Sequence, residues 1–437
     1  MLAEGKLGKA RSELFSAASF KGGLRLCDID ARPGCLRRSL YNAACFESPK
    51  ESVKGEAMRG LRTLLAFSFI GGIFALYPAQ LSAQQYLFTN GNVYDGNGTT
   101  PNSTTALSVS PTGVVKVLDT YSTGAESAGG GYFAQTAVAY AETKTNNCLF
   151  VSNGGNSTIS AFTIDLTDGK LKKVKGSPFS YGESGRQQYG IGLATGGGTL
   201  LFAGNTAYNN ISVLKISTGC ALKAVKTYSA PGSPDGMKVT PDGKFLISAF
   251  LGAVDSYQIN YKTGHIKELG PFAAQGAAAG IEISCDGSTA YFGDAGTNTQ
   301  VEVFSISAQG ALAEVNNFTN SHGKNSNNVI LSPDETKLYV SNTMSNQITT
   351  LSTSSGGGLQ YDSQTTLSGT LEWPLGLAFG KSGNRLFVSE TNSPETIGAL
   401  KAKAKGLKEI AGSPFSVVEN GEDPPSMIAV PGKACTK

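Results

Sequence analysis

Apolar and polar residues alternate over short stretches along most of the chain, and a similar stretch returns about every 45 residues. One repeat unit covers residues 233–274 and contains the β-forming runs GMKVT, FLISAF, VDSYQIN and HIKELGPF, separated by the turn sequences PDGK and KTG. In such turns Pro presets φ and Gly permits a positive φ. Four antiparallel strands in a period of about 40–50 residues predict one blade of a β-propeller.

The second strand of this unit is its most constant part, and similar versions of it occur seven times along the chain. The copies are YLFTN (from Tyr86), LFVSN (Leu149), LFAGN (Leu201), LISAF (Leu246), YFGDA (Tyr291), LYVSN (Leu338) and LFVSE (Leu386). Glycines expected between third and fourth strands keep the same spacing, at Gly169, Gly219, Gly264, Gly310, Gly358 and Gly406. We therefore predict an all-β, seven-bladed propeller of four-stranded antiparallel blades over residues 84–437.

The two ends of the repeat region complement each other. The first unit starts with a second strand at Tyr86, whereas the last unit is complete by Val418 and is followed by one more apolar stretch, residues 426–430. We expect this stretch to be the missing first strand of blade one, since an open sheet edge invites pairing with other chains. Small residues precede the first-strand cores and allow close backbone approach at the axis, namely Gly236, Gly280, Gly376 and Ser426.

Composition supports this fold and narrows the function. The chain has 437 residues, 55 of them Gly, and only 16% are charged, which suits short strands and tight turns. The formal net charge of +3 is small for this length and argues against nucleic-acid binding.

A hydrophobic segment precedes the repeats. In residues 58–83, Arg59 and Arg62 are followed by an apolar run and by LSA at 81–83, which together are typical of a secretory signal peptide. We expect translation to start at Met58 and residues 1–57 to be a mis-assigned or disordered extension. The alternative is an uncleaved membrane anchor. Both interpretations place the propeller in the periplasm or outside the cell.

Four cysteines fall in the propeller region: Cys148, Cys220, Cys285 and Cys435. In an exported chain they permit two disulfides with three possible connectivities. The alternative is four unpaired thiols. The sequence contains no Cys-x-x-Cys pair, so it gives no sign of a zinc or redox motif.

The repeats resemble those of a known family. The string LFVSNGGNSTISAFTIDLTDGKLKKVKGSPF, from Leu149, resembles a repeat of the lactonase-type, 6-phosphogluconolactonase-like seven-bladed propellers, and LSPDETKLYVSN, from Leu331, is similar to YVTN repeats. The resemblance covers essentially all of residues 84–437. It implies an enzyme that opens a sugar lactone with water, with His, Arg and acidic side chains at the mouth of the central channel. Many members carry an Arg-His pair before a first strand, where this chain has Asn327 and Asn328.

Propeller sites usually form on the face that carries the loops entering first strands and the loops joining second to third strands. We expect the entering loops to present Arg186, Asp235, His322, Asn327, Asn328, Glu372 and Trp373. The other loops would present Asn153, Asn205, Asn342 and Glu390. This set predicts an amide-rich and acid-rich site with one aromatic residue.

Hydrolysis of a lactone needs a base for water and a donor for the oxyanion. His322 is the candidate base and Arg186 the candidate oxyanion partner. The alternatives are an ordinary loop histidine and an ion pair of Arg186 with Glu183. Trp373 either caps the rim or stacks on a sugar ring. We expect His265 at a turn on the opposite face.

Two functions remain open on the sequence alone. The first is a monomeric module that binds a sugar, a lactone or a protein, and the second is a hydrolase of an unphosphorylated lactone. The sequence shows no Gly-x-Ser-x-Gly, His-Glu-x-x-His or EF-hand pattern. The glycines of GIGLATGG, residues 190–197, have the wrong spacing for a dinucleotide loop. We predict no cofactor, although backbone carbonyls in the channel leave a metal ion possible, and no membrane contact if the leader is cleaved.

Overall fold

The computed structural model describes residues 84–91, 99–127, 136–182, 191–295, 300–368, 373–391, 396–417 and 426–433. These ranges fall within one compact unit, Leu76–Lys437. The predicted leader at 58–83 and the extension at 1–57 lie outside the described residues. Within the described ranges, no helix is both long and apolar enough to cross a membrane.

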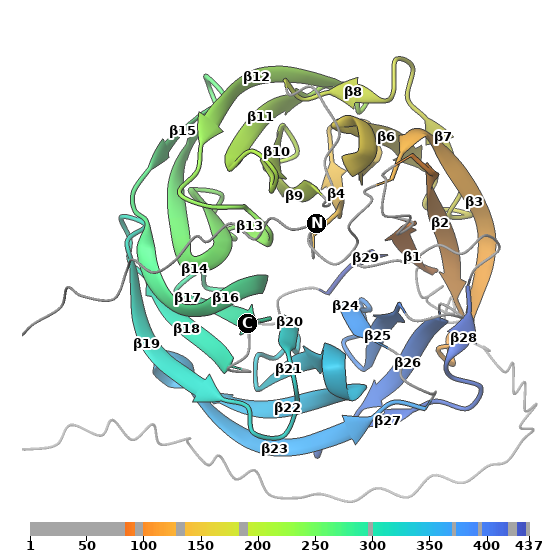
Figure 1. Ribbon diagram of the computed structural model, residues 1–437. Coiled ribbons are helices and arrows are strands. Elements are labelled where there is room, and N and C mark those ends of the chain that lie inside the picture. Colours follow the sequence, from red (N-terminus) through yellow and green to blue (C-terminus); the bar gives the residue numbers. More distant parts are fainter. Residues whose placement is uncertain are drawn as a thin grey trace, which may run out of the picture. The chain divides into compact units, whose positions relative to one another are not determined.

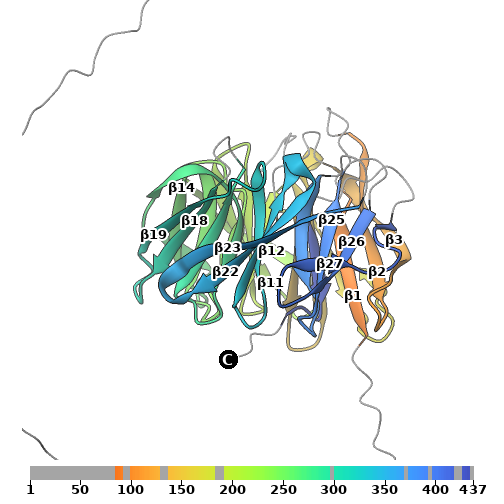
Figure 2. The same ribbon diagram turned by 90° about the horizontal axis from the view of Figure 1, so that it is seen from below.

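Small antiparallel sheets surround a common axis and form the seven predicted blades (Figure 1). In each blade the first strand lies at the axis and the last at the rim, and the strands run between two faces of the ring (Figure 2). Blade one contains, from the axis outward, β29 (Met427–Val430), β1 (Gln85–Asn90), β2 (Pro101–Val109) and β3 (Val115–Glu126).

Blades three and six follow the four-strand plan. Blade three consists of β9 (Ile191–Gly196), β10 (Leu200–Asn205), β11 (Asn210–Ile216) and β12 (Leu222–Ser229). Blade six consists of β20 (Ser326–Leu331), β21 (Lys337–Asn342), β22 (Gln347–Ser354) and β23 (Gly358–Thr366). Short 3-10 turns η1 (Gly154–Asn156), η2 (Thr343–Ser345) and η3 (Ser355–Gly357) join strands in blades two and six.

Blades two and seven have a divided outer strand. Blade two consists of β4 (Val138–Glu142), β5 (Asn147–Asn153), β6 (Thr158–Ile164), β7 (Leu171–Lys173) and β8 (Phe179–Ser180). Blade seven consists of β24 (Pro374–Phe379), β25 (Arg385–Glu390), β26 (Thr396–Ala402), β27 (Leu407–Glu409) and β28 (Phe415–Ser416). The repeated string GSPF divides both strands. There the Ser177 and Ser413 hydroxyls accept the Ala161 and Ala399 N–H groups at 2.9 and 3.0 Å.

Blades four and five share one seven-stranded sheet. Its strands are β13 (Met237–Val239), β14 (Phe245–Asn260), β15 (His265–Glu268), β16 (Phe272–Ile283), β17 (Thr289–Asp294), β18 (Gln300–Ile306) and β19 (Leu312–Thr319). The second and third strands that we predicted separately run together in β14. They still form a hairpin, because Ile259 N–H donates to the Lys244 carbonyl (2.9 Å) as Ile216 does to Thr199 in blade three (2.8 Å). Strand β16 pairs with β14 and then with β17, so it passes from blade four to the axis of blade five.

The hydrophobic core lies between neighbouring blades. Phe202 and Val213 of blade three, for example, pack with Leu246 and Tyr257 of blade four, and all four are buried. Successive side chains of a strand point to opposite faces, so adjacent apolar residues such as Leu201 and Phe202 give the blade two apolar faces. Each face needs a neighbouring blade to cover it.

Glycines at the axis allow first strands to approach closely, as predicted. A Cβ on Gly236 would lie 2.1 Å from the Ala279 carbonyl oxygen of blade five. A Cβ on Gly280 would lie 2.6 Å from the Asn328 Cα of blade six. Any side chain at these positions would push adjacent blades apart.

The carboxy-terminal strand closes the ring, which confirms the prediction from the chain ends. Strand β29 pairs antiparallel with β1, with Tyr86 opposite Val430 and Thr89 opposite Met427. The chain then forms a bridge from Gly432 to Gly380, at the end of β24 in blade seven. The tail therefore ties blade one to blade seven.

Lys433 extends this connection to blades five and six. Its Nζ lies 3.2 Å from Glu282 Oε1 in blade five and 3.1 Å from the Leu331 carbonyl in blade six. Lys238 of blade four also reaches Glu282, at 2.9 Å. Burial alone would raise the pKa of Glu282, but the two ammonium groups outweigh it and lower that pKa. Burial lowers the pKa of Lys433, and Glu282 offsets part of that effect.

A disulfide joins Cys148 in β5 to Cys220 in the turn between β11 and β12, with the Cα atoms 5.5 Å apart. It therefore links blades two and three. Cys285 is disulfide-bonded as well, and Cys435 lies outside the described residues. The alternative of four unpaired thiols was wrong for Cys148, Cys220 and Cys285.

In two of the turns between third and fourth strands, the residue with a positive φ is not the glycine that we expected there. Cys220 (φ 67°), not Gly219, has the positive φ in blade three, and Gly357 (φ 81°) has it in blade six in place of Gly358. Cys220 N–H bonds to the Ser217 carbonyl just as Gly310 N–H bonds to that of Ser307. A cysteine thus occupies a position that favours glycine.

Deleting residues 426–437 should prevent cooperative folding, because β1 loses its axial partner and the ring is left open. Thermal unfolding followed by far-UV circular dichroism, with light scattering for aggregation, measures this. The milder variant Lys433→Met keeps β29 and should lower the free energy of unfolding by about 1–3 kcal/mol. A cooperative, wild-type-like transition of the truncated chain would disprove this account of ring closure.

Removing the Cys148–Cys220 bond should lower the free energy of unfolding by about 4 kcal/mol, since the bond closes a loop of 72 residues. The double variant Cys148→Ala/Cys220→Gly should be about 1 kcal/mol more stable than Cys148→Ala/Cys220→Ala, because glycine adopts the left-handed conformation without penalty. Urea titration of both variants measures the difference. Equal stability would mean that the backbone of this turn is not strained.

Candidate functional site

First strands begin and second strands end on one face of the ring, which we call the mouth face. Backbone hydrogen bonds join the two sets of ends: Ser152 N to Ala137 O (3.0 Å), Asp235 N to Ala249 O (3.1 Å) and Thr391 N to Trp373 O (3.1 Å). The opposite face carries the first-to-second and third-to-fourth strand turns, and we call it the turn face. The two predicted loop sets therefore share the mouth face.

In six blades the second strand ends at the mouth face in a buried amide or carboxylate. These residues are Asn90, Asn153, Asn205, Asp294, Asn342 and Glu390. In blade four the corresponding residue is Phe250. The polar residues recur because each strand end leaves nearby loop groups that need hydrogen bonds.

The Asn153 side chain connects blades one and two by hydrogen bonds. Its side-chain Nδ2 donates to Ser160 Oγ at 2.9 Å, and its Oδ1 accepts from Asn102 Nδ2 of β2 at 2.9 Å. The residue is fully buried. The structure thus shows its amide engaged in contacts within the protein.

Asn342 has the same arrangement in blade six. Its Oδ1 accepts from Asn320 Nδ2, in the loop before β20, at 2.8 Å, and its Nδ2 donates to Thr349 Oγ1 at 2.8 Å. The amide therefore pins the entering loop of blade six to the end of β21.

Asn327 and Asn328 lie within β20, whereas we expected them in the loop before it. Strand pairing begins earlier than predicted because Ser326 already pairs with Asn342. Asn328 Oδ1 accepts the N–H of Val329 at 2.9 Å. Asn327 is 6% exposed, and its carbonyl packs against Gly293 of blade five.

Three further predicted residues reach the mouth face. Asp235 precedes β13 and is 7% exposed. Glu390 ends β25, is fully buried and accepts the Thr396 hydroxyl at 2.7 Å. Trp373 precedes β24 and is half-buried. Arg186 and Glu372 lie outside the described residues.

His322 lies in the loop between β19 and β20 and is exposed. Its ring stacks on Tyr361, with centroids 3.7 Å apart and an angle of 20°. Tyr361 belongs to β23, the outermost strand of blade six. The contact directs this imidazole to the rim, away from the strands at the axis, and its catalytic role stays a prediction. His265 lies at the start of β15 on the turn face, as expected.

Comparison with known proteins agrees with this architecture. Residues 284–406 match the family model described as Lactonase, 7-bladed beta-propeller. This part of the chain, 123 of its 437 residues, resembles the lactonase-type propellers. No curated protein sequence matches the chain.

Solved structures show the same fold at low sequence identity. A candidate 6-phosphogluconolactonase from Bacteroides fragilis is 17% identical with a TM-score of 0.62, and the match covers 80% of this chain and 99% of that one. A second candidate from Bacteroides uniformis is 16% identical with a TM-score of 0.61, covering 79% and 99%. A Pseudomonas aeruginosa periplasmic gluconolactonase is 19% identical with a TM-score of 0.57, covering 76% and 98%.

The propeller holds two buried acids near the mouth face that the sequence analysis missed. Asp255 in β14 and Glu302 in β18 occupy a third-strand position that is Ser160, Ser212 or Thr349 in blades two, three and six. An acid where neighbouring repeats have a hydroxyl residue is the signal that would have identified them. In the described part of the chain, no group of three or more His, Cys, Asp and Glu could hold a metal ion.

Burial is the main cause of a raised pKa in both acids. Burial raises the pKa of Asp255 to about 7, although the N–H of Ser256 donates to its carboxylate at 2.7 Å. Burial also raises the pKa of Glu302, partly offset by the N–H groups of Gln275 and Gly276 at 3.0 and 2.8 Å. Both carboxyl groups therefore keep their proton to a higher pH in the folded chain than in the unfolded one.

Asp255→Asn should stabilise the protein increasingly between about pH 4 and 7. The folded pKa lies above the unfolded one, so the folded state holds an extra proton in this window and wild-type stability falls as pH rises. Chemical denaturation of wild type and variant at several pH values measures the difference. It should be small below pH 4 and constant above about pH 8.

Asp119→Asn is the matched control, because Asp119 is exposed at the rim in β3. Its stability difference from wild type should not follow the same course with pH. A difference for Asp255→Asn that does not grow between pH 4 and 7 would contradict the inference of a buried, protonated carboxyl.

Proposed function

We propose that the chain is an exported propeller that binds a small sugar or lactone at its mouth face. One observation carries the proposal. Asn90 Oδ1, Thr136 Oγ1, Asn205 Nδ2 and Asn327 Oδ1 are buried and have no hydrogen-bond partner among the described residues. All four belong to first-strand starts or second-strand ends.

Such atoms favour a hydroxyl-bearing ligand. A buried polar atom without a partner costs about 1–3 kcal/mol. A hydroxyl group can donate to the two amide oxygens and accept from the amide nitrogen, so a polyol satisfies both kinds of group. Bound water is the competing partner, and a ligand must replace its hydrogen bonds to gain affinity.

Export is supported by the disulfide chemistry. The Cys148–Cys220 bond is typical of oxidising compartments. The leader pattern at 58–83 agrees with this, and the similar Pseudomonas aeruginosa protein is a periplasmic one.

Hydrolysis of a lactone is the second candidate function. The family match and the gluconolactonase named among the similar structures favour it. It requires a base beside an oxyanion donor. The stacking of His322 on Tyr361 favours binding without hydrolysis, because it holds the candidate base at the rim.

Calorimetric titration with glucono-δ-lactone, gluconate and glucose, together with proton release, tests both functions. Binding alone predicts heat of binding without proton release above the spontaneous rate. Asn327→Ala should weaken the binding about tenfold, which corresponds to about 1.4 kcal/mol for a lost hydrogen bond.

Asn384→Ala is the control, because Asn384 is an exposed amide on the turn face. It should bind like wild type. Accelerated proton release that disappears in His322→Ala would replace the binding proposal with the hydrolase. No heat with any of the three compounds would overturn the proposal of a sugar or lactone site.

A further inference from the structure

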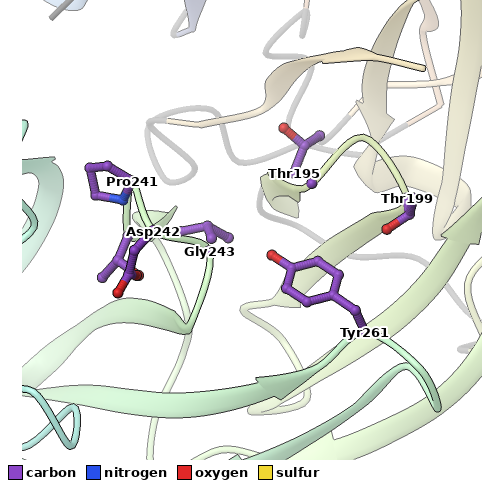
Figure 3. A pocket seen from close by; sticks show the side chains of 9 residues that line it. Thr195, Thr199, Pro241, Asp242, Gly243 and Tyr261 are labelled. Atoms are coloured by element: carbon purple, nitrogen blue, oxygen red, sulfur yellow. The ribbon is translucent and has the colours of Figure 1, made fainter. Parts of the chain in front are cut away.

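The turn face carries a hollow of about 600 Å³ between blades three and four (Figure 3). Thr195 and Thr199 line it from blade three, and Pro241, Asp242 and Tyr261 line it from blade four. Its volume falls in the range of about 300–1,000 Å³ that is typical of small-molecule sites. None of the residues proposed for the mouth face takes part.

Tyr261 is the central side chain of this hollow, and a run of glycines makes room for it. A Cβ on Gly196 would lie 2.7 Å from the Tyr261 hydroxyl oxygen, and one on Gly243 would lie 3.1 Å from it. Gly196 does not have a positive φ, so the close approach of Tyr261 is the reason for glycine at this position. Thr195, Gly197 and Thr199 of this glycine-rich stretch, which no dinucleotide motif explains, thus form one wall of the hollow.

The hollow presents hydrogen-bonding groups around an aromatic ring. The Tyr261 hydroxyl oxygen is buried between the two turns (Figure 3) and has no hydrogen-bond partner among the described residues. Burial and then the Asp242 carboxylate raise the pKa of Tyr261, so the phenol stays neutral. Thr195 Oγ1 donates to the Tyr140 carbonyl at 2.7 Å and keeps its lone pairs for a ligand.

Asp242 supplies a carboxylate at the edge of the hollow. Burial opposes its ionisation, but hydrogen bonds from Lys244 and Thr240 outweigh this and hold its pKa at about 2. Lys244 Nζ lies 2.8 Å from its Oδ2 and balances the charge. The site therefore favours an uncharged ligand that donates hydrogen bonds.

We propose that this hollow is a second binding site, which takes a saturated ring bearing several hydroxyl groups, such as a pyranose or a cyclic polyol. The C–H face of such a ring packs against the Tyr261 ring and Pro241. Its hydroxyls donate to Asp242 and Thr195. Aromatic side chains with a few convergent polar groups are the usual means of holding such a ligand.

Saturation-transfer-difference NMR on the propeller chain tests the proposal, with methyl β-glucopyranoside, methyl β-galactopyranoside and myo-inositol as probes. All variants carry Asn327→Ala, which weakens the mouth-face site, so that the part of the signal lost on changing the hollow is assigned to the hollow. At least one probe should give a signal in this background. Tyr261→Ala should reduce it at least fivefold.

Two further variants make the result independent of folding defects. Thr199→Tyr fills the hollow from an exposed position and should also reduce the signal at least fivefold. Leu166→Ala changes the matching turn residue of blade two, which is 39% exposed, and should leave the signal unchanged. Absence of a signal with every probe in the Asn327→Ala background overturns this site, and so does a signal that persists in both Tyr261→Ala and Thr199→Tyr. The mouth-face proposal is tested separately by its own titration.

Discussion

Closure of the ring is the constraint on which the rest of this structure depends. Each blade has two apolar faces, and only a neighbour on each side can remove both from water. The pairing of β29 with β1 makes blade one a complete sheet and leaves no blade with an uncovered face. The tie is reinforced where Lys433 meets Glu282, because a buried carboxylate needs a cation to remain charged. The tail, which meets the mouth face where the Ser426 carbonyl accepts the Asn90 N–H, therefore controls whether every site exists.

Closure also explains why the mouth face is polar yet mostly occupied by its own contacts. Seven second strands end there, and the backbone and loop groups around each end must be hydrogen-bonded. Asn153 and Asn342 meet that need, and both are buried as a result. Amides in such positions therefore have a structural role first. Only atoms without a partner in the described ranges, such as Asn327 Oδ1, are suited to a ligand.

The two faces of the propeller thus differ in how a site arises. On the mouth face, polar atoms recur with the blade repeat. A ligand there would bind the atoms that are not hydrogen-bonded within the described part of the protein. On the turn face, the hollow depends on a departure from the repeat, in which the aromatic Tyr261 of blade four faces glycines of blade three. The disulfide is a similar departure, because Cys220 stands where the other blades favour glycine.

The sequence by itself determined the blade number, the strand order and the closing role of the tail, because alternation, turn glycines and the complementary ends are local and repeat with a fixed period. Blade four was the exception, since nothing local marks that β14 and β16 run on without a break. Only the tertiary structure decided which polar residues hold neighbouring elements together and that the His322 ring stacks on Tyr361. Those properties depend on which side chains of neighbouring blades meet. Such contacts join residues tens of positions apart, and no local pattern encodes them.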